Sequence, residues 1–339
     1  MQTKPDLSDE TILARIRDGF KLAAAKVTFL PLGYENSAIY RITGEDGTAY
    51  FLKLIKFNFN EISVSVPAYL HSRGIAQVLA PMETSHHTLW VKKCEFIWSL
   101  YPFFEGKTGF ERALSKTQWI ELGRAMKAIH ATRLPAELEE WVPREDYSPG
   151  KRELVMSYLE QVKQDDYDDP IAAGFAEILM TKQDEIRCMV ERAEKLAQVL
   201  LKRSLEPVFC HSDLHGRNIL VNTQGELVII DWDTPILAPK ERDLMFIGGG
   251  VGGIWNNDQE VEWFYEGYGR TEIDAVALSY YRYERIITDI ADFSGQVFSL
   301  WGSVEDRQKC LRLNEQFGPN NVVEIAHKTY GTHFGKAIR

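Results

Sequence analysis

The sequence has few cysteines, no long apolar run and no excess of basic residues. Its four cysteines are widely spaced along the chain, at Cys94, Cys188, Cys210 and Cys310. Without closely spaced pairs, the sequence indicates neither a disulfide framework nor a cysteine zinc site. We therefore expect a reducing, cytoplasmic location.

Two further absences bear on membranes and nucleic acids. No stretch approaches the roughly 18 apolar residues of a spanning helix, and residues 1–10 lack the apolar core of a signal peptide. Acidic residues outnumber basic ones by 49 to 39, which gives a net charge of −10. The electrostatic field of this net negative charge repels nucleic acids and anionic lipids. We expect a cationic small molecule as the partner; the oligomeric state stays open.

The first hundred residues have the pattern of a small β-rich lobe. Turn-forming residues at 33–36 and 44–47 separate three apolar runs, which indicates an antiparallel meander. One helix is expected at 61–72, with Pro67 near its first turn or at a kink. The expected strands are 27–32, 38–42, 49–55, 89–91 and 95–101.

After residue 106 the pattern becomes mainly helical. Helices are expected at 116–132, 152–162, 171–203, 258–268, 273–293 and 304–316, and short strands at 208–210, 219–221 and 227–230. The predicted fold class is α+β with two lobes. The N-terminal β-rich lobe spans 1–101, a hinge linker spans 102–106, and a helical C-terminal lobe spans 107–339. Because small molecules bind in clefts, we expect a cleft at the linker.

The segments 211–221 and 229–233 carry the candidate chemistry. Asp213 can accept a hydrogen bond from an alcohol, and Asn218 offers a neutral oxygen five residues later. Asp231 ends an apolar strand and offers an anionic oxygen. In phosphoryl transfer, one acid orients the attacking hydroxyl, while an amide and a second acid hold Mg²⁺ against the nucleotide phosphates. The pattern therefore favours phosphoryl transfer.

Two other interpretations of this segment remain open. Asp213, Asn218 and Asp231 are residue types that commonly cap turns and helices. Alternatively, His211, Asp213 and His215 could hold zinc in a hydrolase. No further histidine or cysteine pair lies nearby in the sequence to complete a zinc shell.

Segments 211–221 and 229–233 resemble the aminoglycoside phosphotransferase family, which has a protein-kinase-like fold. Three later segments look like the spectinomycin phosphotransferases within that family; they are 237–252, 264–269 and 320–326.

The resemblance implies that Asp213 is the catalytic base and that Asn218 and Asp231 bind Mg²⁺. It also implies that Lys53 contacts the α- and β-phosphates of ATP. A lysine inside an apolar strand needs a partner for its charge, unless it extends to solvent from an edge. The usual kinase partner is a glutamate on the following helix. Glu61 is the only acid there, and whether it pairs with Lys53 stays open.

By the same resemblance, the loop 32–38 positions the nucleotide through Asn36 and Ser37, although a plain hairpin turn is an alternative. The linker residues Tyr101 and Phe103 are expected to contact adenine, or else only to pack. Asp243 is expected to brace the catalytic loop, and His130 to be a packed histidine.

The helix 279–293 carries Glu284, Asp289 and Asp292. These carboxylates are expected to pair with ammonium groups of the acceptor; a solvated charged face is the alternative.

The predicted function is ATP- and Mg²⁺-dependent transfer of the γ-phosphoryl group to a hydroxyl of spectinomycin or a related aminocyclitol. One alternative is a kinase for a metabolite alcohol such as homoserine, choline or methylthioribose. Another is a nucleotide-binding pseudokinase. The sequence does not decide which hydroxyl is phosphorylated or whether ATP is preferred over GTP.

Overall fold

The computed structural model describes residues 4–32, 37–300 and 302–334. The chain forms two compact units. The first unit contains residues 1–113, 132–142 and 217–235, and the second contains 114–131, 143–216 and 236–339. The lobe boundaries at residues 101 and 106 stay a prediction.

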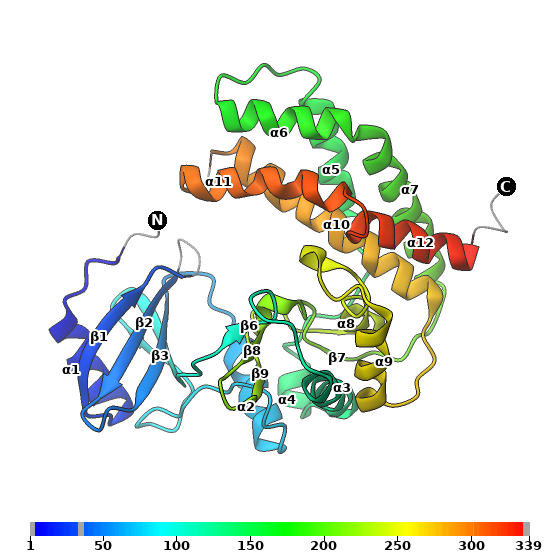
Figure 1. Cartoon of the computed structure of the whole chain (residues 1–339). Helices are drawn as coiled ribbons and strands as arrows, with labels where there is room; N and C mark the ends of the chain where they lie inside the picture. The colour runs from blue at the N-terminus through cyan, green and yellow to red at the C-terminus, as the bar shows by residue number, and fades with distance from the viewer. Residues whose placement is uncertain (1–3, 33–36, 301, 335–339) are drawn as a thin grey trace. The chain divides into compact units, whose positions relative to one another are not determined.

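The first unit is built on a five-stranded antiparallel sheet with strand order β1-β2-β3-β5-β4. Figure 1 shows its first three strands in blue. The strands are β1 (Ala24–Leu30), β2 (Ser37–Gly44), β3 (Ala49–Ile55), β4 (Val91–Lys93) and β5 (Phe96–Pro102). The meander is confirmed, and the fourth strand begins two residues later than predicted.

Two helices accompany this sheet rather than the one predicted. The predicted helix is α2 (Ile62–Ser72), and Pro67 lies inside it. The helix α1 (Asp9–Phe20) was not predicted. Its residues Ile12 and Ile16 are fully buried and join the sheet's core cluster with Trp98. The apolar spacing of four residues, with Ser8 as the N-cap, was the available signal.

A second, three-stranded sheet also belongs to the first unit. It has the order β6-β8-β9 and consists of β6 (Lys107–Thr108), β8 (Ile219–Val221) and β9 (Leu227–Ile229). The backbone N–H of Leu79 donates to the carbonyl oxygen of Ile229, and the N–H of Ile229 donates to that of Gln77. The short helix α4 (Ala136–Glu139) packs on α2. The hairpin β8–β9 is therefore tied to the segment that follows α2.

The second unit is mainly helical and contains a two-stranded sheet of β7 (Val208–Cys210) and β10 (Ile236–Ala238). Its helices are α3 (Lys116–Ala131), α5 (Gly150–Gln161), α6 (Pro170–Thr181), α7 (Gln183–Leu200), α8 (Glu241–Leu244), α9 (Asp258–Tyr268), α10 (Ala275–Phe298), α11 (Val304–Cys310) and α12 (Val322–Phe334). Together with the first unit they confirm the α+β class.

Two helix predictions are corrected, and one further helix was not predicted. The predicted helix at 171–203 is two helices, α6 and α7, which meet at Lys182. The predicted helix at 304–316 is α11 followed by a 3₁₀ segment, Leu311–Phe317. The helix α12 was not predicted, although Val322, Ala326 and Tyr330 are buried at helical spacing.

The helix α10 is the central element of the second unit and packs against α5, α7 and α12 (Figure 1). It begins at Ala275 because the side chain of Asp274 accepts hydrogen bonds from the N–H groups of Val276 and Ala277, both at 2.9 Å. Ile287 and Ile290 are fully buried.

The helices α3 and α9 cross at two glycines. A Cβ on Gly267 would lie 1.9 Å from the carbonyl oxygen of Ile120, and one on Gly123 would lie 2.1 Å from that of Phe264. Any larger residue would separate the two backbones. The motif at 264–269 is therefore explained, in part, by helix packing. Among the described residues, no helix is long and apolar enough to cross a membrane.

Candidate functional site

Asp213 lies in the loop after β7 and has a side-chain partner at each of its carboxylate oxygens. Oδ1 accepts a hydrogen bond from Nη1 of Arg285 at 2.6 Å, and Oδ2 lies 3.3 Å from Nε2 of His215. Burial alone would raise the pKa of Asp213, but the hydrogen bond with His215 and the charge of Arg285 outweigh it and hold this pKa well below its usual range. Asp213 is therefore ionised at neutral pH and can accept a hydrogen bond from an alcohol.

Arg285, on α10, connects Asp213 to Asp289. Its Nη2 lies 3.2 Å from Oδ1 of Asp289, one helical turn further along. Gln316 donates to the other oxygen of Asp289 at 3.0 Å. Burial raises the pKa of Asp289, and the charge of Arg285 opposes that rise. Arg285 was not predicted from the sequence, where its spacing of four residues from Asp289 was the local signal.

The other two acids of this helix have separate partners. Asp292 forms an ion pair with Lys151 and its side chain is 57% exposed. Glu284 accepts a hydrogen bond from Nη1 of Arg152 at 2.7 Å, and the Arg152 side chain is buried. The structure therefore brings Asp289, but not Glu284 or Asp292, into contact with the Asp213–Arg285 pair. The alternative that these acids form a solvated charged face is therefore wrong for Glu284, which pairs with a buried arginine.

Asp243 holds the backbone of the loop that carries Asp213. Its Oδ2 accepts from the N–H of His211 at 2.9 Å, and its Oδ1 accepts from the N–H of Ser212 at 2.7 Å. Ser212 has a φ of 72°, a conformation that costs free energy in a non-glycine residue and needs such support. The predicted brace is confirmed.

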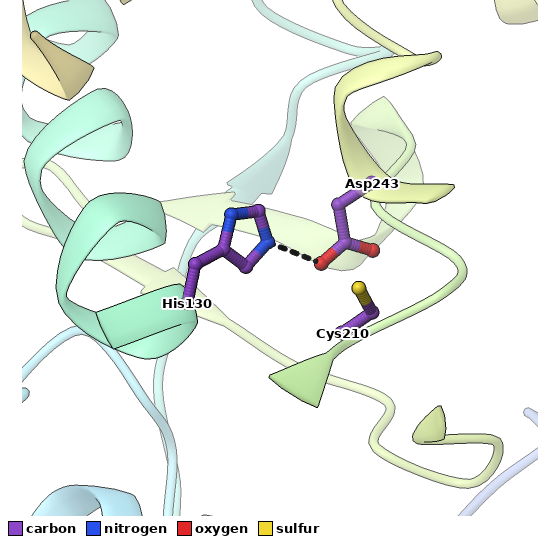
Figure 2. A group of neighbouring side chains, drawn as sticks. All are labelled: His130, Cys210 and Asp243. Atoms are coloured by element: carbon purple, nitrogen blue, oxygen red, sulfur yellow. Dashed lines mark hydrogen bonds and ion pairs between the residues drawn. The ribbon is translucent and has the colours of Figure 1, made fainter. Parts of the chain in front are cut away.

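Figure 2 shows the buried group around this brace, formed by His130, Cys210 and Asp243. Nε2 of His130 lies 3.0 Å from Oδ2 of Asp243, and Nδ1 lies 2.8 Å from the hydroxyl of Tyr268. Both ring nitrogens of this buried imidazole therefore have a hydrogen-bond partner. His130 is therefore a packed histidine that supports the brace, as predicted.

The same group is the one set of three histidine, cysteine or acidic residues, among those described, whose ligand atoms converge within 4.8 Å. Burial raises the pKa of the Cys210 thiol well above its usual value, so the thiol stays neutral and is a poor metal ligand. The alternative of a zinc site at His211, Asp213 and His215 is not supported, since these residues form no such convergent group in the described chain.

In the first unit, Lys53 lies in the middle of β3 and pairs with Asp233. Its Nζ lies 2.9 and 2.8 Å from the two carboxylate oxygens. The side chain of Lys53 is 19% exposed. Glu61 is instead the residue that precedes α2. The kinase-like pairing of Lys53 with Glu61 is thus replaced by a pairing with Asp233.

Asn218 and Asp231 flank the hairpin β8–β9 at its open end. Ile219 pairs with Ile229, and the N–H of Ile230 donates to the carbonyl oxygen of Asn218 at 2.9 Å. Asp231 is therefore one residue past the position opposite Asn218. Its φ of 65° is left-handed, which is uncommon for a non-glycine residue and typical of functional sites. An amide oxygen beside a carboxylate is a donor set that suits Mg²⁺.

The residues predicted to contact the nucleotide have mixed outcomes. Asn36 lies outside the described residues, and Ser37 is the first residue of β2. Burial and the charges of Asp233 and Asp231 raise the pKa of Tyr101. The N–H of Phe103 donates to the carbonyl oxygen of Ala49 and extends the sheet. These nucleotide contacts stay predictions.

Among solved structures, two of the most similar are complexes of the spectinomycin phosphotransferase APH(9)-Ia. The complex with ADP and spectinomycin is 36% identical, with a TM-score of 0.89, and the match covers 96% of this chain and 99% of that one. The AMP-bound complex is 35% identical, with a TM-score of 0.86, and the match covers 95% and 98%. These matches confirm the kinase-like fold.

A third structure, an aminoglycoside phosphotransferase from Alicyclobacillus acidocaldarius, is 13% identical with a TM-score of 0.66 and shares the fold; the match covers 98% of this chain and 97% of that one. No curated protein sequence matches the chain. The model of the phosphotransferase enzyme family matches residues 26–276, which is most of the chain. The chain therefore belongs to the phosphotransferase enzyme family and is an ATP-dependent phosphotransferase that acts on an alcohol group, as the sequence predicted.

Proposed function

We propose that this enzyme transfers the γ-phosphoryl group of ATP to a hydroxyl of spectinomycin or a closely related aminocyclitol. The observation that carries the proposal is the similarity, over nearly the whole of both chains, to a structure that holds ADP and spectinomycin. The ionised Asp213 beside the acidic Asp289 supports it, since these two carboxylates suit a cationic alcohol.

In the proposed reaction, Asp213 is the general base. The acceptor oxygen attacks the γ-phosphorus, the bond to the β–γ bridging oxygen breaks, and ADP leaves. The hydroxyl proton passes to Asp213, whose depressed pKa keeps it ionised before the reaction. The brace from Asp243 keeps the backbone of this loop in its strained conformation.

The nucleotide is held, in this proposal, by residues of the first unit. Lys53 contributes a positive charge to the α- and β-phosphates, and the aromatic residues Tyr101 and Phe103 lie against adenine. Asn36 and Ser37 meet the phosphates. Asn218 and Asp231 hold Mg²⁺, which, when bound, neutralises charge on the phosphates.

The acceptor is recognised through its charge. Spectinomycin carries two secondary ammonium groups on a rigid fused ring system, which an acidic protein surface accommodates. Asp289 is the favoured partner for one ammonium group because it contacts the same guanidinium, that of Arg285, as Asp213 does. Asp292 is proposed for the second ammonium group, with Lys151 as its partner in the free protein. The acidic composition, with a net charge of −10, agrees with a cationic substrate.

Mass spectrometry of a small acceptor panel tests the proposal. Purified protein with Mg-ATP is incubated separately with spectinomycin, kanamycin, homoserine, choline and methylthioribose. We expect a product heavier by one phosphoryl group from spectinomycin and none from kanamycin, whose larger and more flexible ring set should not fit. Asp213→Asn is the matched negative control.

The other outcomes select the alternatives. Turnover of homoserine, choline or methylthioribose, with spectinomycin inert, would replace the antibiotic by a metabolite. An ATP-dependent rise in thermal stability without turnover of any acceptor would instead indicate a pseudokinase.

A further inference from the structure

Arg285 makes contacts with two carboxylates that the proposed function gives different tasks. Nη1 donates to Asp213 at 2.6 Å, and Nη2 lies 3.2 Å from Asp289. Each carboxylate has a further partner, because His215 lies beside Asp213 and Gln316 donates to Asp289. One guanidinium thus serves as counter-ion to both the proposed base and the proposed acceptor-binding acid.

Asp289 is the less compensated of the two carboxylates. Arg285 supplies one positive charge and contacts both Asp213 and Asp289, whereas His215 contacts Asp213. Gln316 is neutral. Burial and the charge of Asp213 raise the pKa of Asp289, and the charge of Arg285 and the hydrogen bond from Gln316 oppose that rise. A second cation would be stabilised here.

Arg285 itself is not fully satisfied. Its Nε is buried and has no hydrogen-bond partner among the residues that the structure describes. The guanidinium also lies 5.8 Å from the ring centroid of Phe246, a contact that does not fix the group in one position as a bidentate ion pair does. An unsatisfied buried donor favours a rearrangement that provides a partner.

We propose that Arg285 is a specificity-determining counter-ion of the acceptor site, whose contact with Asp289 is replaced by an ammonium group of the acceptor. The proposal rests on the function proposed above. In the acceptor complex, Arg285 keeps its contact with Asp213 and so keeps the base ionised. The ammonium group takes its place at Asp289, so that each carboxylate has its own cation.

A consequence distinguishes this role from a purely structural one. Removing the guanidinium takes the ion-pair partner away from Asp289 in the free protein, which raises the free energy of that state. A cationic acceptor then restores a partner at Asp289 without first displacing Arg285. Acceptor binding should therefore become tighter, whereas loss of a structural contact would weaken it or leave it unchanged.

Calorimetric titration with spectinomycin tests this prediction on the full-length chain. Arg285→Gln should lower the dissociation constant by about 10-fold or more, the scale of one hydrogen bond to a charged group. Arg285→Lys keeps the charge but reaches one carboxylate at a time, so its dissociation constant should lie between those of wild type and Arg285→Gln. The affinity for ADP should not change.

Two controls isolate the effect of charge. Arg203→Gln removes a guanidinium that pairs with Asp274 elsewhere in the second unit, and it should leave spectinomycin binding unchanged. Spectinomycin acetylated on both amines has no cation, so Arg285→Gln should not increase its affinity.

Unchanged or weaker spectinomycin binding by Arg285→Gln, with wild type active, would overturn the counter-ion role and leave the proposed function standing. If Arg285→Gln does not fold, the lysine variant decides: tighter binding supports the role, and equal or weaker binding overturns it. If wild type neither binds nor phosphorylates spectinomycin, the proposed function fails and this inference fails with it.

Discussion

The Nζ atom of Lys53 lies 2.9 and 2.8 Å from the two carboxylate oxygens of Asp233. Asp233 follows Asp231 by two residues, so the proposed phosphate-binding lysine pairs with a residue close in sequence to the proposed metal ligand, and all three belong to the first unit. The partner explains how a lysine is tolerated in the middle of an apolar strand. It also implies that nucleotide phosphates compete with Asp233 for the lysine charge.

Lys53→Ala should act mainly through the nucleotide. We expect the KM for ATP to rise by roughly 10- to 100-fold, because a charged hydrogen bond to phosphate is lost, while acceptor affinity is unchanged. Steady-state kinetics with varied ATP measures this. Lys56→Ala is the matched control, since Lys56 pairs with Glu95 in an exposed ion pair. An unchanged KM for ATP would contradict the assignment.

The sequence predicts the position of Lys53 in a strand but not the residue that pairs with it. Its place in a buried strand follows from the apolar pattern of 49–55, and the need for a partner follows from elementary electrostatics. The identity of the partner cannot be predicted in this way, because Asp233 is 180 residues away in the sequence. Only the folding of the first unit, which includes the β8–β9 hairpin, brings Asp233 near Lys53. Glu61 was nearer in sequence, but the pairing depended on tertiary structure.

Asp213→Asn should abolish most of the turnover and spare nucleotide binding. A positioned acid or base contributes roughly 10²- to 10⁴-fold to the rate, so we expect a fall of that size in kcat. Calorimetry should show nearly unchanged ATP affinity, because the role assigned to Asp213 is at the acceptor. Asp165→Asn, in an exposed segment of the second unit, is the control. Turnover within a few-fold of wild type would exclude Asp213 as the base.

Asp231→Ala should raise the Mg²⁺ concentration that gives half-maximal rate. Loss of a group that only supports a metal ligand costs about 10- to 100-fold in metal affinity, so loss of an anionic ligand should cost at least that much. A Mg²⁺ titration at saturating ATP measures the effect. Asp46→Ala, at the exposed turn between β2 and β3, should leave the titration unchanged. If Asp231→Ala responds to Mg²⁺ as wild type does, Asp231 is not a ligand.

Local sequence signals predicted helix ends better than helix breaks. The helix α9 has the predicted bounds because Asn257 caps its first turn and Gly269 follows its end. No glycine or proline lies at Lys182, where α6 and α7 meet, so the sequence pattern predicted one unbroken helix. Arg285 was missed for a related reason, since its contact with Asp213 spans 72 residues of sequence.

Asp243→Asn should destabilise the protein and change its response to acid. Burial alone would raise the pKa of Asp243, but the hydrogen bond and charge of His130, with the N–H groups of the loop, bring it below the ordinary value. A depressed pKa stabilises the folded state above the unfolded pKa of about 3.9, and this stabilisation is lost as the pH falls through the folded pKa.

At pH 7 the asparagine amide cannot accept both loop hydrogen bonds, which should cost about 1–3 kcal/mol. Calorimetric unfolding at pH 7 and near pH 3 should show the difference between wild type and Asp243→Asn shrinking at the lower pH. Asp292→Asn, which removes an exposed ion pair, should cost less than about 1 kcal/mol at pH 7. A difference for Asp243→Asn that is the same at both pH values would show that the charge of Asp243 does not support the loop.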